Sequence, residues 1–223
     1  MTLVDPTLDK EKELFTEGFT RVGALDEVGT GSASGPLHCA IVVIDNVDSS
    51  PEGLRDSKLL TAKSREGLVP SIHAWVLDFA IGAASAAEID DYGLTIALRL
   101  AGHRALHQLR VAPDVILLDG KRDWLTPPEQ PGLLAPTYAD VVVPPVRTLV
   151  KADRLCASVA AASVLAKVDR DGVMIQLARQ FPGYDWEVNK GYLTAGHLRA
   201  IRLLGQCGEH RRSWRLPPHE ELD

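Results

Sequence analysis

The strongest constraint on the fold is a pair of apolar runs near the N-terminus, residues 22–28 and 39–44, separated by a stretch rich in Gly, Ser and Pro. Apolar runs of this length, bounded by turn-forming residues, are typical of buried β-strands joined by a turn. Residues 81–89 are also small and apolar and predict a third strand that ends near Asp90. We therefore expect the fold to begin with neighbouring strands of one sheet.

The rest of the chain alternates between helical and strand patterns. Apolar residues recur at helical spacing over four segments and form short runs over two more. The predicted helices cover residues 59–79, 95–109, 157–177 and 193–204, and the predicted strands cover residues 114–118 and 141–143. Several prolines predict a loop over residues 123–137. Strands that follow one another early and are separated by helices later predict a mixed sheet flanked by helices, in an α/β domain.

The domain boundaries are predicted from polarity. Residues 1–18 are polar and charged and predict an N-terminal arm, either a short helix or a loose segment. Residues 19–223 would form the main domain, which would end in a helical extension from about residue 180. The chain has no internal repeat or low-complexity segment.

Composition places the chain among globular proteins of a reducing compartment. It has 223 residues, 45% of them hydrophobic, which suffices for one sizeable core. Its net charge of -6 argues weakly against a nucleic-acid partner, but much of the acid lies at the two ends of the chain. The three cysteines are far apart, and no apolar stretch reaches the ~18 residues that span a bilayer. We expect a cytoplasmic protein without a membrane segment.

Four acidic residues are candidates for a site because they stand at strand ends or loop starts: Asp26, Glu27, Asp119 and Asp153. Each one alone is equally explained as a solvated turn residue. Together they would repel one another by roughly 4 kcal/mol per pair at ~4 Å, unless cations compensate them. Carboxylate oxygens select Mg²⁺ or Mn²⁺, and a pair of such ions supports phosphodiester hydrolysis.

One geometric difficulty concerns Asp26 and Glu27. Adjacent residues of a strand point to opposite faces of the sheet, so the two side chains share a site only if the strand ends or bends there. Gly29 and Gly31 follow directly and would permit such a bend. Without further information, the same glycines are equally typical of a plain hairpin turn.

An ordered series of short strings resembles the bacterial ribonuclease HII family from about residue 20 to 215. The strings are DEVGTG (26–31), LRDSK (54–58), EID (88–90), LLDG (117–120), VKAD (150–153), AASVLAKVDRD (161–171), PGYDWEVNKGY (182–192), GH (196–197) and HRRSW (210–214). Each string alone is weak, whereas the set in this order and spacing is specific. The resemblance implies a ribonuclease H-like mixed sheet flanked by helices, with a small helical C-terminal part.

The resemblance also implies an activity. Asp26, Glu27, Asp119 and Asp153 match the four catalytic acids of that family, which hold two divalent cations, Mg²⁺ or Mn²⁺. The expected enzyme is a monomeric endoribonuclease that acts on RNA–DNA hybrids and on single ribonucleotides in duplex DNA. It would cut on the 5′ side of a ribonucleotide and leave a 3′-hydroxyl and a 5′-phosphate. Asp171 would support the site rather than bind metal.

Seven residues are candidates for substrate contacts. Gly29, Thr30, Gly31 and Tyr192 stand at the family's substrate-contact positions, and Lys58, Arg147 and Lys151 would present positive charge to a nucleic-acid backbone near the acids. The backbone of the Gly29–Thr30–Gly31 segment would contact the 2′-hydroxyl and neighbouring phosphates. Thr30 stands where the family usually has Arg or Lys, which predicts a weaker hold on phosphate. Tyr192 would pack against the sugar, although a core tyrosine explains it equally well. Asn189 replaces the family's usual histidine.

Other interpretations remain open at this point. The lysines and arginines named above are equally explained as solvated surface charges. The HRRSW string at residues 210–214 would either touch the duplex or anchor the tail. A chain with a weakened Gly-Thr-Gly segment would bind hybrids but cut them slowly, although a mere binder does not need four acids. A phosphotransferase on the same sheet would need a phosphate-binding Gly-Lys-Ser/Thr loop, which the sequence lacks.

Overall fold

The fold is a mixed sheet of five strands in the order β3-β2-β1-β4-β5. It is seen in a computed structural model that describes residues 5–129, 136 and 141–217. The strands are β1 (Val22–Val28), β2 (Leu37–Ile44), β3 (Asp78–Ala84), β4 (Val115–Asp119) and β5 (Val146–Leu149). β1, β2 and β3 pair antiparallel, whereas β4 and β5 are parallel to β1. The predicted mixed sheet is therefore confirmed.

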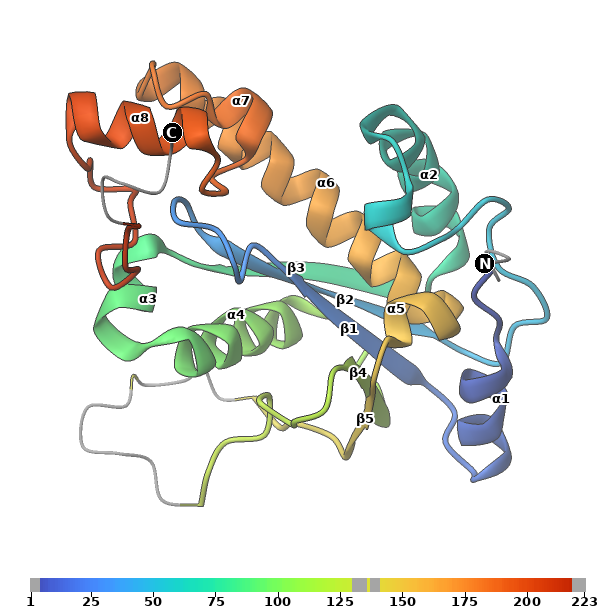
Figure 1. The fold of residues 1–223 in the computed structure, drawn as a ribbon. Coiled ribbons are helices and arrows are strands. Elements are labelled where there is room, and N and C mark those ends of the chain that lie inside the picture. Colours follow the sequence, from blue (N-terminus) through green and yellow to red (C-terminus); the bar gives the residue numbers. More distant parts are fainter. Residues whose placement is uncertain (1–4, 130–135, 137–140, 218–223) are drawn as a thin grey trace.

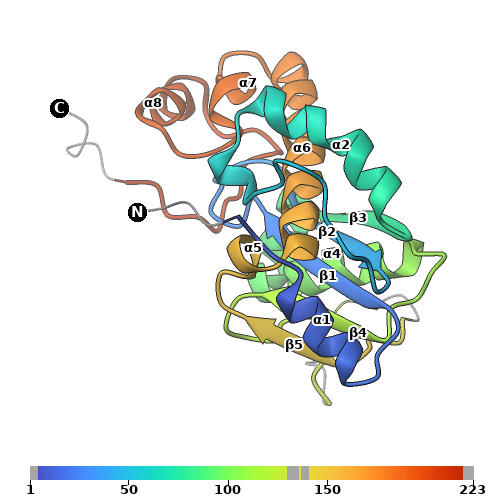
Figure 2. The same cartoon turned by 90° about the vertical axis from the view of Figure 1, so that its right-hand side faces the viewer.

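Helices cover both faces of the sheet (Figures 1 and 2). The helices are α1 (Asp9–Thr16), α2 (Ala62–Trp75), α3 (Ala86–Tyr92), α4 (Leu94–Gln108), α5 (Ala152–Leu155), α6 (Ala157–Gln180), α7 (Trp186–Asn189) and α8 (Ala195–Leu204), with a 3₁₀ turn, η1, at Ser57–Leu59. The long helix α6 crosses one face, and α4 lies against the other. The C-terminal helices α7 and α8 pack beside the far end of α6, which confirms the small helical C-terminal part.

Two apolar layers hold the sheet between these helices. The alternate residues Ala24 and Val42 face α6, whereas Leu25 and Ile41 face α4, as expected for side chains that alternate along strands. All eight residues of β2 are buried, because this strand lies in the interior of the sheet and is covered on both sides.

The expected strand over residues 81–89 is wrong in its second half. β3 ends at Ala84, and residues 86–92 form helix α3. Ser85 caps this helix by accepting a hydrogen bond from the Glu88 N–H, and the Glu88 side chain accepts one from the Ser85 N–H. This Ser-x-x-Glu capping box is a helix-start signal that outweighs the small apolar residues around it.

The expected strand at residues 141–143 is also wrong. Residues 141–145 are irregular, and the edge strand β5 begins after Pro144 and Pro145. Proline has no N–H to donate, so the strand pairing between β5 and β4 begins only after Pro144 and Pro145. The helix expected over residues 59–79 is shorter, Ala62–Trp75, because Thr61 caps its start and β3 begins at Asp78. The last part of the expected loop over residues 123–137 falls mostly outside the described residues.

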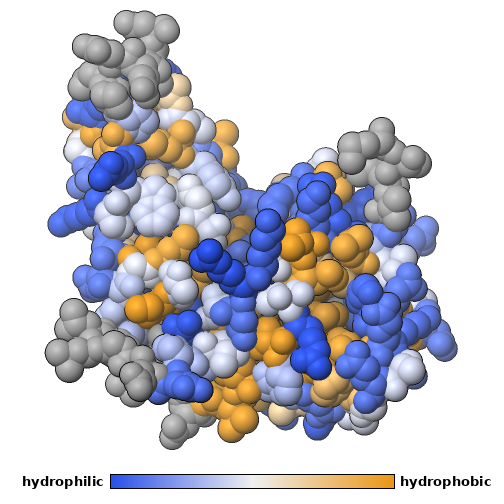
Figure 3. All heavy atoms as spheres, turned by 60° about the horizontal axis from the view of Figure 1, so that its bottom comes forward, coloured by the Kyte–Doolittle hydropathy of each residue, from blue (hydrophilic) through white to orange (hydrophobic). Residues whose placement is uncertain are grey.

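The N-terminal arm contains a helix that packs on the domain. In α1, Glu11 and Leu14 are buried, and the Thr7 N–H bonds to the Leu155 carbonyl ahead of α6. Among the described helices, none is long and apolar enough to cross a membrane. Figure 3 shows that the face toward α4 and β4 carries apolar patches scattered between hydrophilic side chains.

Candidate active site

The candidate acids gather where β1 runs past the end of β4. The last pair between these two strands is Leu25 with Leu118, whereas β1 continues to Val28. Asp26 and Glu27 therefore lie on a part of β1 that has no neighbour on the β4 side. Asp119 is the last residue of β4 and stands at the same corner of the sheet.

The strand end resolves the difficulty with the two adjacent acids. Asp26 follows the register of Ala24 toward α6, whereas Glu27 follows that of Leu25 toward α4. The Glu27 carboxylate nevertheless feels the charges of both Asp26 and Asp119. No strand blocks this edge of β1, so the Glu27 carboxylate lies within electrostatic reach of the acids on the other face of the sheet.

Burial and mutual repulsion make these carboxylates hard to ionise. Burial, together with the charges of Asp119 and Asp153, raises the pKa of Asp26 to about 7, although hydrogen bonds from Ser163 and the Glu27 N–H oppose the shift. Burial and the Asp26 charge raise the pKa of Glu27 to about 8. One Glu27 oxygen, Oε2, is buried without a hydrogen-bond partner. A cation at this corner would favour the ionised forms of both acids.

Asp153 is carried to the acids by a tight turn after β5. The Ala152 N–H donates to Asp119 Oδ1 over 2.7 Å, which ties the start of α5 to the end of β4. Lys151, just before, has a φ of 61°, a left-handed conformation that is rare for residues other than glycine. Asp153 is buried, and burial plus the charges of Asp56 and Asp119 raise its pKa.

Lys58 lies beside these acids, as expected. Its ammonium is 3.5 Å from Asp153 Oδ2, and the side chain is 72% exposed, so the group remains accessible to a ligand. Partial burial lowers the pKa of Lys58, but the carboxylates of Asp56 and Asp153 outweigh this effect and raise it. Lys58 is therefore a cation at neutral pH.

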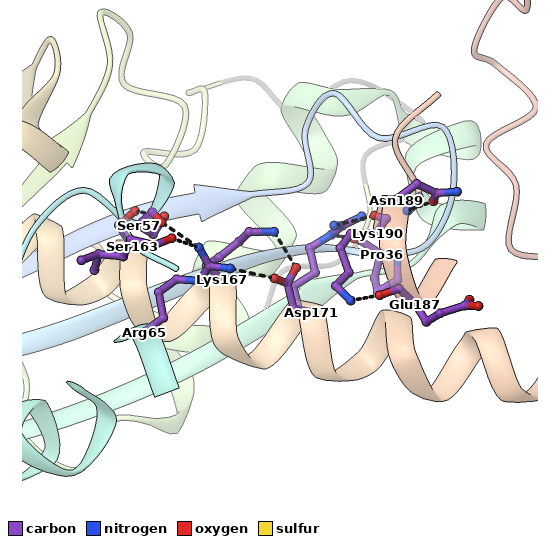
Figure 4. Close-up of polar contacts among 12 residues, drawn as sticks. Pro36, Ser57, Arg65, Ser163, Lys167, Asp171, Glu187, Asn189 and Lys190 are labelled. Atoms are coloured by element: carbon purple, nitrogen blue, oxygen red, sulfur yellow. Dashed lines mark hydrogen bonds and ion pairs between the residues drawn. The ribbon is translucent and has the colours of Figure 1, made fainter. Parts of the chain in front are cut away.

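Asp171 supports the turn that carries Lys58. It forms ion pairs with Lys167 and, at 3.4 Å, with Arg65. Arg65 in turn donates to the carbonyls of Ser57 and Leu60, which bracket η1. Figure 4 shows this series of contacts running along α6 from Ser57 to Asp171. The contacts match the supporting role expected for Asp171.

The Gly29–Gly31 segment and Tyr192 come together from opposite ends of the chain. Gly29 has a φ of 87°, and a Cβ placed on Gly31 would lie 3.9 Å from Tyr192 Cε1. The carbonyl of Gly191 accepts hydrogen bonds from the Ala33 and Ser34 N–H groups. Tyr192 is 40% exposed, so it is a surface residue beside the segment rather than a core tyrosine.

Asn189 and Arg211 have structural roles. The Asn189 side chain donates to the Tyr184 carbonyl and accepts from the Gly191 N–H, which shapes the turn before Tyr192. Arg211 is fully buried and its guanidinium stands over the Trp214 ring, 5.1 Å from the centroid. Of the two readings of the HRRSW string, the anchoring one therefore holds for Arg211.

Two expected substrate contacts do not touch the acids. Arg147 in β5 lies 3.9 Å from Glu17 beside α1, and both side chains are about half exposed. The exposed Lys151 contacts no acidic side chain in the part of the chain that the structure describes. Their cations can serve only a ligand that extends beyond the acids.

The donor chemistry of the corner fits hard divalent cations. Asp26, Glu27, Asp119 and Asp153 offer only carboxylate oxygens, and one of these is buried without a partner. Within residues 5–129, 136 and 141–217, however, no three His, Cys, Asp or Glu side chains stand in an arrangement that could hold a metal ion. Uncompensated carboxylates repel, so the side chains must move closer when a cation binds.

Sequence reasoning missed Asp56 and Ser163. Asp56 is buried, accepts from the Lys58 N–H and pairs with Arg154 at 3.2 Å. The Ser163 hydroxyl forms a hydrogen bond with the Ser57 hydroxyl. A hydrogen bond from Ser163 to Asp26 also lowers the pKa of Asp26 and so opposes the effect of burial. Asp56 stands two residues before Lys58 in the LRDSK string, so the sequence could have indicated this acid. The position of Ser163 beside the acids depends on how α6 packs on the sheet, which the sequence does not show.

Comparisons with known proteins show the family of this chain. The model of the ribonuclease HII family matches residues 23–216. A ribonuclease HII of Streptomyces griseus is 42% identical over 214 residues, which cover 94% of this chain and 84% of that protein. A ribonuclease HII of Nitrosococcus oceani is 42% identical over 195 residues, covering 87% and 89%.

Solved structures agree in fold. The crystal structure of ribonuclease H2 from Pyrococcus horikoshii matches with a TM-score of 0.67 and 26% identity, covering 87% of this chain and 93% of that one. A Bst-RNase HIII structure in complex with Mn²⁺ matches with a TM-score of 0.58 and 23% identity, covering 83% and 63%. The family model, the identity with these relatives and the order of the sheet agree, and the chain belongs to the ribonuclease HII family of endoribonucleases.

Proposed function

We propose that the acidic corner is the active site at which this chain cuts the RNA strand of RNA–DNA hybrids and single ribonucleotides in duplex DNA. The observation that carries the proposal is geometric. Asp26 and Glu27 lie where β1 continues past its last pair with β4, Asp119 ends β4, and the Ala152 N–H, next to Asp153, bonds to Asp119. Burial raises the pKa values of Asp26, Glu27 and Asp153, so placing these acids inside the fold costs free energy that a structural role does not explain.

The four carboxylates would hold two divalent ions, Mg²⁺ or Mn²⁺. Such ions, when bound, supply an activated water and stabilise the leaving 3′ oxygen of a phosphodiester. The chain's own groups place the substrate. Lys58, mostly exposed and beside Asp153, would neutralise the phosphate that approaches the acids. Cleavage on the 5′ side of a ribonucleotide then leaves a 3′-hydroxyl and a 5′-phosphate.

Recognition of the ribose would come from the other side of the corner. The Gly29–Gly31 segment begins two residues after Glu27, and its Gly31 lies close to Tyr192. The 2′-hydroxyl is the group that distinguishes RNA from DNA, so the part of the protein that recognises a ribonucleotide must contact the edge of the sugar. The backbone of this segment and the exposed Tyr192 ring would form this ribose-recognition site. All of these groups come from one chain, so a monomer suffices, and a cytoplasmic location stays a prediction.

The decisive variant is Asp119→Asn. It keeps the oxygen that accepts from the Ala152 N–H but removes the charge. We expect cleavage of a duplex with one ribonucleotide to fall at least about a hundredfold, since a metal site contributes several kcal/mol. Asp48→Asn, on the exposed loop after β2, is the matched control and should retain wild-type activity.

Two results would contradict the proposal. Full activity of Asp119→Asn, with an unchanged circular dichroism spectrum, would remove the assignment of the acids. Wild-type protein that binds hybrids equally well in Mn²⁺ and in EDTA but cuts in neither would show the alternative, a hybrid-binding protein of this fold.

A further inference from the structure

Two fully buried arginines lie beneath the Gly29–Gly31 segment. Arg170 is in the middle of α6, Arg211 follows α8, and both have 0% exposure. Neither forms an ion pair with a carboxylate within the described residues. A buried cation without a counterion is strongly disfavoured unless something else compensates it.

Arg170 joins the segment to the region around Tyr192. It donates to the carbonyls of Pro36 over 2.8 Å, Ser34 over 3.3 Å and Lys190 over 3.0 Å. Figure 4 shows Pro36 and Lys190 close together at the end of the series of contacts along α6. The first two carbonyls precede β2 and the third precedes Tyr192, so one guanidinium sets the distance between these two parts.

Arg211 holds the segment from a second direction. Its Nε and Nη2 donate to the Gly35 carbonyl over 3.1 and 3.0 Å, and Nη1 donates to the Thr30 carbonyl over 3.2 Å. The carbonyl of Thr30 is therefore turned inward. The N–H groups of Thr30 and Gly31 donate to no acceptor among the residues described, so they are free to meet a ligand.

The two arginines also charge the segment. They lie close enough that burial and the Arg170 charge lower the pKa of Arg211 to about 9, which still leaves it protonated at neutral pH. Thr30 itself offers no cation. Two positive charges nevertheless lie below the free N–H groups of Thr30 and Gly31, in a medium that screens them weakly. An anion above the segment would compensate them.

We propose that Arg170 and Arg211 are positioning residues for ribonucleotide recognition. They fix the 29–36 segment against Tyr192, and they supply from below the positive charge that Thr30 lacks, so that a backbone phosphate is drawn onto the segment. This proposal rests on the function proposed above, because it assumes that the segment and Tyr192 meet the ribonucleotide. On this proposal, ribonucleotide recognition by the segment and Tyr192 depends on two side chains that do not contact the substrate.

The test compares charge with geometry at each arginine. Arg→Gln removes the charge, whereas Arg→Lys keeps it but cannot bridge two carbonyls as a guanidinium does. The matched control is Arg179→Gln, which removes an exposed charge from the same helix. For each folded variant, kcat and KM are measured on a short DNA duplex with one ribonucleotide, and the all-DNA duplex is used as a competitive inhibitor over a range of salt concentrations.

For Arg170→Gln and Arg211→Gln we expect a KM about tenfold higher and a dependence of log KM on log salt less steep by about 0.9. The preference for the ribonucleotide duplex is the inhibition constant of the all-DNA duplex divided by the KM of the ribonucleotide duplex. This ratio should also fall about tenfold. The lysine variants should keep the salt dependence and lose the preference. If the arginines had a purely structural role, the variants would have a lower unfolding temperature, but the salt dependence of KM and the preference for the ribonucleotide duplex would stay as in wild type.

Three outcomes overturn the proposal. Folded glutamine variants with wild-type salt dependence and preference would remove both roles. Lysine variants with wild-type preference would remove the positioning role. Failure of even the lysine variants to fold would assign the arginines to folding instead. A wild-type protein that does not cut the ribonucleotide duplex would instead contradict the proposed function, so the two failures are distinguishable.

Discussion

Arg170 occupies the space that a side chain at position 29 would need: a Cβ placed on Gly29 would lie 2.1 Å from Arg170 Nε. Gly29 also has a φ of 87°, which disfavours any other residue. The glycine of this segment is thus required by the arginine below it, whether or not a substrate approaches from above. This observation explains the glycine at position 29 without reference to the substrate, whereas Gly31 is under no such constraint.

Gly29→Ala should therefore both strain the backbone and displace Arg170. We expect a loss of about 3 kcal/mol in the free energy of unfolding and a fall in kcat/KM. Gly53→Ala is the control, since Gly53 has a φ of 77° but a Cβ there meets nothing within 4 Å. It should lose only about 1 kcal/mol. Equal losses in thermal unfolding of the two variants would contradict the steric role of Arg170.

The acidic corner predicts an unusual pH dependence for the metal-free protein. The folded-state pKa values of Asp26 and Glu27, about 7 and about 8, lie above their ordinary values of 3.8 and 4.5. Between these pKa values the folded state binds more protons than the unfolded state. The two acids therefore contribute to the free energy of unfolding, fully below about pH 4, and this contribution is lost as pH rises toward 8. Each pK unit of this shift corresponds to about 1.4 kcal/mol.

Asp26→Asn isolates this effect. Relative to wild type, its unfolding temperature without metal should rise as pH increases from about 5 to about 8. The buried histidines His197 and His210, whose pKa values burial lowers, act in the opposite direction but equally in both proteins. Mg²⁺ should stabilise wild type more at high pH, because the cation competes with protons. A difference that does not change with pH would refute the raised pKa.

Glu11 should anchor the N-terminal arm to α6. Its buried carboxylate accepts from the N–H and hydroxyl of Ser158 over 2.8 and 2.6 Å, at a helix start whose own N-cap side chain makes no capping bond. Glu11→Ala should lower the free energy of unfolding by about 1–3 kcal/mol, because it leaves a buried donor without an acceptor. The exposed Glu13→Ala should lose less than about 0.5 kcal/mol. Chemical denaturation of the two variants provides the comparison.

Asp171 and Arg65 should act as one unit on the turn that carries Lys58. Asp171→Asn and Arg65→Gln should each raise KM several-fold with little change in kcat, since Lys58 would bind phosphate less well. Because both changes break the same contact, the double variant should lose little more than either single one. Additive losses in KM would show that the two residues act separately.

The amphipathic and apolar patterns of the sequence determined most of the architecture. The helix predicted over residues 157–177 and the strand over 114–118 are confirmed as α6 and β4, because their patterns are long or strongly apolar. β5 was missed because four partly exposed residues after two prolines carry no apolar signal. α3 was missed because its capping box lies among small apolar residues that also suit a strand.

The sequence by itself also identified the family, because the order and spacing of short strings can be compared without any knowledge of contacts. The assignment of the four acids to the active site stays a prediction. Only the tertiary structure decided that Asp26 and Glu27 lie on a part of β1 without a neighbour on the β4 side, because β4 ends at Asp119 while β1 continues to Val28. It alone revealed Arg170 and Arg211 as buried partners of the Gly29–Gly31 segment. A pattern along the chain records polarity, whereas the burial of a charge is set by residues more than a hundred positions away.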